Sequence, residues 1–268
     1  MSGKRAAAAL VTGKRVRKKV ERLADQVQAA AVSANKGTSA VRELGGKPSY
    51  RPGQAPKSAP VATVLPGTQP LPTRNKHGRL VFADHPEFSP NLTPAEVLQR
   101  GSFGGTYFRP IDSGTTGKRE TDAWKEFPAD WFKGLDIRKQ VTRSWSSYDT
   151  SVNKFKVKCG GTLDMWESSG WISPIDPYGW FQWYCRFYLG RRSADDDRQI
   201  ARGNGVMSDK GRFRNQLIGK CSHAATTFDD ARISPVIRQS LQHWGYELTQ
   251  ADADAYCRKK KLQPLKKP

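Results

Sequence analysis

Residues 166–192, with the sequence WESSGWISPIDPYGWFQWYCRFYLGRR, hold four of the eight tryptophans of this 268-residue chain. Five further phenylalanine and tyrosine residues lie between them. Each large aromatic side chain buries roughly 150–250 Å², so such residues dominate the energetics of a core. The stretch therefore predicts a tightly packed aromatic core.

The segment 180–189 (WFQWYCRFYL) fits two periodicities. As a strand it presents one wholly apolar face, and as a helix it leaves only Gln182 and Arg186 on a narrow polar stripe. Pro177 suits a helix start and Gly190 suits a helix end, which favours the helix. Residues 176–179 then form either a turn or the first part of that helix.

Helix-start signals recur on both sides of this stretch. Thr93 and Glu96 have the spacing of a capping box, with proline at the first helical position. We expect further helices from Ala129, Leu163, Ser193, Ser234 and Thr249. Extended segments are fewer: 80–82, and 154–158, where Phe155 and Val157 alternate with lysines. The predicted fold class is mainly α with a small extended or β portion, and α+β is the second choice.

The net charge of +20 is unevenly distributed. Residues 1–79 carry 16 Lys and Arg against 3 acids, and residues 258–268 carry six bases and no acid. The segment 80–257 is left with a net charge of +1. The basicity thus belongs to the two ends, and the sequence predicts a near-neutral globular domain between basic tails.

The first 79 residues contain two kinds of sequence. Residues 14–32 lack glycine and proline and have a narrow apolar stripe, which is compatible with a helix. Residues 33–79 are rich in proline, glycine and small polar residues, so they bury too little apolar surface to offset their ordering entropy. We expect a largely disordered tail over 1–79, one globular Trp-rich domain over 80–257 and a second disordered basic tail over 258–268.

The four cysteines form no CxxC pair, which argues against a zinc ribbon or finger. We expect no metal and no cofactor. The sequence has no secretory h-region and no apolar run of about 18 residues, so a soluble intracellular protein with reduced thiols and no membrane partner is expected.

Clusters of Lys and Arg at both ends are of the kind found in nuclear addresses and nucleic-acid-binding patches. Within the domain, the run KGRFRNQLIGK (210–220) is the strongest basic patch. These residues are the candidate nucleic-acid contacts: Lys14, Arg15, Arg17, Lys18, Lys19, Lys210, Arg212, Arg214, Lys220, Arg258, Lys259, Lys260 and Lys261.

Five arginines follow the aromatic stretch, and three aspartates lie among them. Arginine beside aromatic rings can hold bases or phosphates. The neighbouring acids oppose a phosphate, so ion pairs that join two helices are the favoured interpretation. The residues concerned are Arg186, Arg191, Arg192, Arg198 and Arg202, with Asp195, Asp196 and Asp197.

The sequence offers weaker candidates for catalytic residues than for nucleic-acid contacts. Glu167 and Asp176 flank Trp171, and an apolar setting raises the pKa of a carboxyl group towards a useful range. His223 and His243 have no nucleophile beside them in a known motif, and Cys185 lies in an apolar run. A structural role is favoured for each, and no catalytic residue is assigned.

The runs DPYGWFQWYCRFYLGRR (176–192), GRFRNQLIGK (211–220) and SPVIRQSLQHWGYELT (234–249) resemble an uncharacterised family of eukaryotic proteins. The resemblance covers roughly residues 80–257. It implies one domain and a eukaryotic source. No activity is assigned to the family, so no site residues are transferred.

The charge distribution leads to a first hypothesis: a non-enzymatic nuclear protein that binds DNA or RNA without sequence preference through its basic tails. Mitochondrial and cytoplasmic locations are the alternatives. A second hypothesis is an enzyme that acts on a base, nucleotide or sugar in a Trp-lined pocket. A third is a protein-interaction module that uses an exposed aromatic patch.

Overall fold

The computed structural model describes residues 67–268, and helices dominate this part of the chain. The predicted helix over residues 14–32 lies outside the described residues. Short strands form two antiparallel pairs, β1 (Thr73–Arg74) with β2 (Leu80–Val81) and β3 (Ile111–Asp112) with β4 (Arg119–Glu120). The α-helices are α2 (Pro94–Gln99), α3 (Ile137–Gln140), α4 (Leu163–Ser168), α5 (Trp180–Tyr188), α6 (Asp196–Met207), α7 (Arg212–His223), α8 (Pro235–His243) and α9 (Gln250–Lys260).

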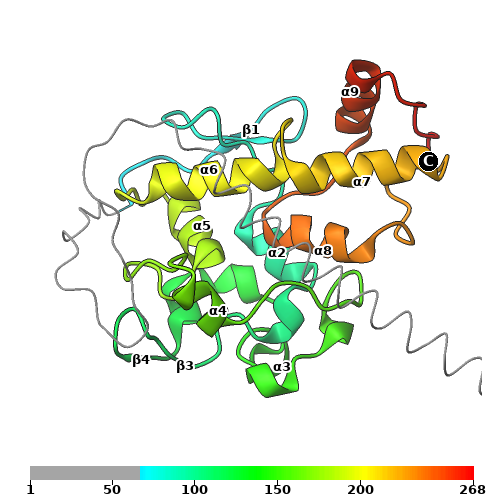
Figure 1. The fold of residues 1–268 in the computed structure, drawn as a ribbon. Coiled ribbons are helices and arrows are strands. Elements are labelled where there is room, and N and C mark those ends of the chain that lie inside the picture. The colour runs from blue at the N-terminus through cyan, green and yellow to red at the C-terminus, as the bar shows by residue number, and fades with distance from the viewer. Residues whose placement is uncertain (1–66) are drawn as a thin grey trace, which may run out of the picture.

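Helices α6 and α7 run one after the other along one side of the molecule, with α5 and α8 below them (Figure 1). Helix α9 and the C-terminus lie at the far end of α7. Between α2 and α4 the described chain forms five short 3-10 helices: η1 (Phe103–Gly105), η2 (Ala123–Glu126), η3 (Ala129–Phe132), η4 (Trp145–Ser147) and η5 (Thr150–Val152).

The aromatic core centres on α5 and on Phe88, which precedes α2 in the chain. The Phe88 ring packs edge-on against four α5 rings, with centroids 5.6–6.5 Å apart. The polar atoms of these rings are satisfied, since Tyr184 Oη donates to Leu92 O at 2.6 Å and Trp183 Nε1 donates to Asp196 Oδ1 at 2.8 Å. Because each O–H and N–H group has an acceptor, these tyrosine and tryptophan side chains are buried without an unpaired polar atom. The aromatic stretch is therefore the core of the fold.

The predicted helix over 180–189 is confirmed, as are the capped helix starts at Thr93 and Thr249. Helix α8 begins after Ser234 without a side-chain cap, α6 begins at Asp196 and not directly after Ser193, and the helix from Ala129 is a 3-10 helix. Thr93 and Glu96 form a complete capping box at α2. Thr249 Oγ1 accepts from Asp252 N at the start of α9. Residues 176–179 form a turn, and α5 begins after it, behind Gly179 with a φ of 85°.

The strand predicted from the alternation of Phe155 and Val157 is wrong. Lys156 has a φ of 55°, which breaks an extended conformation. The fully buried Asn153 organises a loop instead, because its Oδ1 accepts from Gly104 N and its Nδ2 donates to Val157 O. The hydrogen bonds that the buried side-chain amide makes with backbone groups therefore decide the conformation here, and the alternation of apolar residues and lysines does not.

Both predicted domain boundaries shift. The folded part begins before residue 80, because β1 pairs with β2. At the other end, α9 continues to Lys260, and Leu265 is 5% exposed. Ser222 Oγ donates to Gln263 O at 2.8 Å, so residues 258–268 are part of the domain and not a separate tail.

Candidate aromatic pocket and basic surface

A pocket of about 120 Å³ opens where the first turn of α5 meets the last turn of α8. Helices α4, α6 and α7 also contribute side chains, so the pocket lies where most of the helical elements meet. No aspartate or glutamate is among its lining residues in the described part of the chain. The wall is mainly aromatic and includes Phe103, Tyr107, Trp145, Tyr148, Trp166, Trp171, Tyr178, Trp180, Phe181, Phe213 and Trp244.

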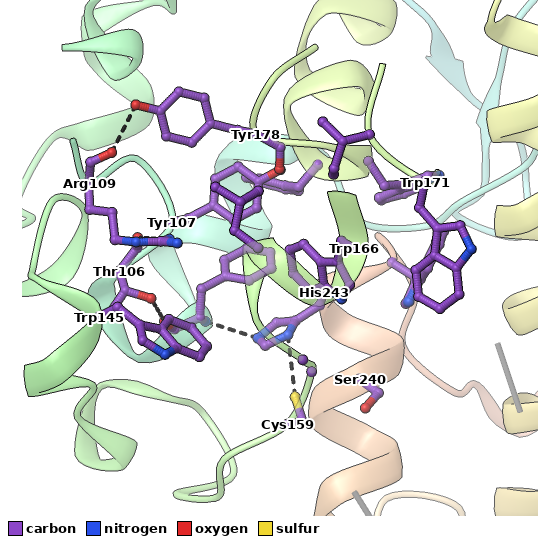
Figure 2. A pocket seen from close by; sticks show the side chains of 18 of the residues that line it. Thr106, Tyr107, Arg109, Trp145, Cys159, Trp166, Trp171, Tyr178, Ser240 and His243 are labelled. Carbon is purple, nitrogen blue, oxygen red and sulfur yellow. Dashed lines mark hydrogen bonds between the residues drawn. The ribbon is translucent and has the colours of Figure 1, made fainter. Parts of the chain in front are cut away.

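Arg109 forms one side of the pocket, beside Trp145 (Figure 2). Its guanidinium carbon lies 5.2 Å from the centroid of the Trp145 ring, and Nη1 donates to Thr106 O at 3.1 Å. Loss of water on burial lowers the pKa of Arg109 below its ordinary value. Within residues 67–268, no carboxylate lies within 4.0 Å of its guanidinium.

Arg202 of α6 lies beside Trp171. Trp171 and Arg109 are on opposite sides of the view in Figure 2. Its guanidinium carbon is 5.5 Å from the Trp171 ring and 5.6 Å from the Trp244 ring. Burial, helped by the nearby positive charge of Arg198, lowers the pKa of Arg202 to about 10. It therefore stays charged at neutral pH, although it has no ion pair with any described carboxylate.

The hydrogen bonds of Arg202 use only part of its donor capacity. Nη1 donates to Gln199 Oε1 at 3.0 Å and to Trp171 O at 3.3 Å. Nε and Nη2 donate to no acceptor in the described part of the chain. The unused donors of a planar guanidinium that lines a pocket suit an oxyanion such as a carboxylate or phosphate, because two oxygens of either group can accept parallel hydrogen bonds.

The floor of the pocket brings together Cys159 and His243, which are 84 residues apart in the chain. Sγ of Cys159 lies 3.3 Å from His243 Nδ1 (Figure 2). His243 Nε2 accepts from Phe103 N at 3.0 Å, so the neutral ring carries its proton on Nδ1. Nδ1 therefore donates to the sulfur and has no lone pair with which to remove the thiol proton.

The electrostatics of this pair agree with the hydrogen bonds. Burial raises the pKa of the Cys159 thiol to about 12 and lowers the pKa of His243 to about 3. A nucleophilic cysteine needs the opposite shift of its pKa, towards a thiolate beside an imidazolium. The pair is thus a neutral, hydrogen-bonded part of the pocket floor.

The two candidate catalytic carboxylates have structural positions, and neither lines the pocket. Glu167 Oε1 accepts from Gly114 N at 2.9 Å and fastens the turn between β3 and β4. Asp176 is 0% exposed and accepts from Arg191 at 2.7 and 2.8 Å and from Arg186 at 2.9 Å. Burial raises the pKa of Asp176, and the two guanidinium groups oppose that shift.

Arginines after the aromatic stretch form ion pairs, but mostly with partners elsewhere in the chain. Arg186 joins Glu126 and Asp176, and Arg192 joins Asp84 at 2.6 Å. Arg198 alone among them pairs with one of the three local aspartates in the described ion pairs, Asp195. The ion pairs therefore tie α5 and the segment after it to loops, and Arg202 is left facing the pocket.

The candidate nucleic-acid contacts in the described part of the chain lie on α7, in the turn before it and on the C-terminal segment, residues 258–268. Arg214 differs from the other candidates because its side chain is not available to a partner. It is 3% exposed and is paired with Asp209 and Asp252. Ser222 near the end of α7 bonds to Gln263, and residues 226–227 pair with Lys266, so the two elements are in contact. We call the following exposed residues the basic surface: Lys210, Arg212, Lys220, Arg258, Lys259, Lys260, Lys261, Lys266 and Lys267.

Each residue of the basic surface lacks a carboxylate partner within 4.0 Å among the described residues. The N-terminal cluster Lys14, Arg15, Arg17, Lys18 and Lys19 lies outside the described residues. A metal site has no support in the described part of the chain. Cys221 is buried whereas the nearby His223 is exposed, and no described group of three or more His, Cys, Asp or Glu side chains is placed to hold a metal ion.

Sequence reasoning missed Arg109 and grouped Arg202 with the arginines expected to form ion pairs, whereas Arg202 has no ion pair among the described residues. Arg109 and Arg202 are 93 positions apart, and neither belongs to a motif. The one sequence signal available for Arg109 is its position directly after the aromatic pair Tyr107 and Phe108. Such signals are too common in cores to single out a site.

No family model, curated protein or solved structure matches this chain. The functional assignment therefore depends on the geometry of this chain alone. Over residues 67–268, no helix is both long enough and apolar enough to cross a membrane.

Proposed function

We propose that the protein binds nucleic acid without sequence preference, through the basic surface together with the N-terminal Lys and Arg cluster. The observation that carries the proposal is that all nine cations of the basic surface are exposed and without a carboxylate partner in the described chain. Such cations gain free energy when they displace the counterions condensed on a phosphate backbone.

The rest of the domain supports this assignment by contrast. Most arginines around α5 are engaged by acids, for example Arg186, Arg191 and Arg192. A paired guanidinium has little to gain from a phosphate, because binding would first break its ion pair. The unpaired cations on α7 and the C-terminal segment are free of that cost, and they lie on elements that contact each other.

Binding of the full chain to labelled duplex DNA and single-stranded RNA, measured by anisotropy from 50 to 200 mM salt, tests the proposal. A variant with Lys220, Lys259 and Lys260 each changed to Gln is expected to bind more weakly. Its slope of log K against log salt is expected to fall by about 0.9 for every lost contact with a duplex phosphate.

The matched control changes Lys118, Lys133 and Arg138 to Gln, which are also exposed and unpaired in the described chain but lie outside α7 and the C-terminal segment. It removes the same charge, so its slope is expected to stay within about one unit of the unchanged protein. Equal losses in the two variants, or no binding by the full chain, would contradict the proposal. A third variant, with the cluster 14–19 neutralised, measures the N-terminal contribution.

The same N-terminal cluster is the basis for a proposed nuclear location, because short Lys/Arg-rich runs act as nuclear addresses. A fluorescent fusion of the full chain is expected to accumulate in the nucleus. Neutralising Lys14, Arg15, Arg17, Lys18 and Lys19 is expected to abolish that accumulation, and an unchanged distribution would refute this part.

A protein-interaction module based on an exposed aromatic patch finds less support. The large hydrophobic side chains that are exposed in residues 67–268 are Leu71 and Val81, and neither is aromatic. The tryptophan-rich stretch is turned inward, where its rings form the core and the pocket.

A further inference from the structure

We propose that the aromatic pocket binds a small anion built on a single aromatic ring, with its phosphate or carboxylate group held by Arg202 or Arg109. This site is distinct from the basic surface, since no residue of that surface lines the pocket. The ligand proposed for the pocket is a small molecule, whereas the ligand proposed for the basic surface is a polymer.

The size of the pocket indicates one ring. Its volume is about 120 Å³. An apolar protein cavity of about 150 Å³ accepts benzene, so the present pocket matches a group of one six-membered ring. The tryptophans that line the pocket, Trp145, Trp166, Trp171, Trp180 and Trp244, surround such a ring with aromatic side chains.

The charge of the pocket indicates an anion. Two guanidinium groups line it, no carboxylate lines it, and both arginines have a pKa lowered by loss of water. A buried charge without a partner is costly to keep, and a bound anion removes that cost while gaining charge-assisted hydrogen bonds. The unused Nε and Nη2 donors of Arg202 are the groups available to it.

The placement of the two cations defines the shape of the ligand. Arg109 lies beside Trp145, and Arg202 lies beside Trp171. Figure 2 shows Arg109 with Trp145 on one side of the pocket and Trp171 on the other. His243, on which Phe103 is stacked at a centroid distance of 4.0 Å, lies between Arg109 and Trp171 in the view of Figure 2. A ring in the pocket therefore has a cation on either side, and a substituent that carries negative charge meets one of them in either orientation.

Tryptophan fluorescence reports on this site directly, because five of the eight tryptophans line it. The full chain is titrated with phenyl phosphate, uridine 5′-monophosphate and benzoate, which separate phosphate from carboxylate sources of the anion. Phenol and uridine are the neutral counterparts, and adenosine 5′-monophosphate tests a two-ring base. A one-ring anion is expected to change the fluorescence saturably and to bind at least about tenfold more tightly than its neutral counterpart.

Arg202→Met and Arg109→Met keep most of the side-chain volume and remove the charge. Each is expected to weaken binding of the one-ring anion by about tenfold, whereas the exposed Arg138→Met is expected to leave it unchanged. Thermal unfolding with and without the anion separates loss of binding from loss of folding. No saturable binding by any of the three one-ring anions, or equal binding by the double variant R109M/R202M, overturns the proposal. Equal binding of adenosine 5′-monophosphate overturns the limit to one ring.

Discussion

Buried and half-buried arginines meet two different environments in this molecule. Arg186 and Arg191 converge on Asp176, whose side chain is 0% exposed and accepts hydrogen bonds from both. Arg109 and Arg202 face an aromatic pocket whose described lining residues include no carboxylate. The first pair is satisfied by a carboxylate of the fold, whereas the second pair has no carboxylate partner among the described residues and donates to neutral oxygens. An arginine whose charge is paired within the fold is thus weak evidence for a binding site, whereas one that lines a pocket without a carboxylate partner is a candidate for anion binding.

The largest expected effect comes from breaking the satisfied pair. Asp176→Asn leaves Arg191, which is 8% exposed, without a counter-charge, whereas Arg186 keeps Glu126. Removing one partner of a buried ion pair typically costs about 3–5 kcal/mol, so a loss of that size is expected in the free energy of unfolding measured with urea.

The matched control for this change is Asp112→Asn at the exposed pair with Arg119, where the side chains are 78% and 63% exposed. Its expected cost is about 0–1 kcal/mol. Equal costs at the two sites would show that the Asp176 cluster is not a structural anchor.

His243 shows a third solution for a buried base, which is to stay neutral. Burial lowers its pKa to about 3. Between pH 3 and about 6.5 the unfolded chain therefore binds a proton that the folded chain does not, and stability falls as the pH falls through that range. The expected loss is about 1.4 kcal/mol for each pH unit below 6.5, or about 2 kcal/mol from pH 7 to pH 5.

The measurement compares urea unfolding at pH 7 and pH 5 for the unchanged protein and for His243→Gln. The variant lacks the titrating ring, so its stability is expected to change less over the same interval. An identical pH dependence in both would assign the effect to the other histidines or to the carboxyl groups.

The smallest expected effect on the free energy of unfolding comes from an arginine without a carboxylate partner, and its sign is expected to be opposite to that of Asp176→Asn. Arg202→Met removes a charge that has no described carboxylate partner, together with hydrogen bonds to Gln199 and Trp171. Because the desolvation cost of the charge disappears with it, the free energy of unfolding without ligand is expected to stay the same or to rise by up to about 1 kcal/mol. A loss of several kcal/mol, like that expected for Asp176→Asn, would place Arg202 among the structural arginines.

Local sequence signals predicted helices α2, α5, α8 and α9, but no helix was expected at α3 or α7. The capping residues Thr93 and Thr249 and the terminating Gly190 each act within one helical turn, so their effect is visible in a short window. The expected strand around Phe155 failed for the opposite reason. Its conformation depends on Asn153, which satisfies the backbone of Gly104, 49 residues away.

The sequence by itself determined the helical character of the domain, the burial of the aromatic stretch and the location of the unbalanced charge. These properties follow from composition and from interactions between residues a few positions apart. Only the tertiary structure decided that Asp176 is an anchor, that Arg109 and Arg202 face one pocket, and that residues 258–268 join α7. Such pairings depend on which helices pack together, and packing joins residues whose separation in the chain carries no signal.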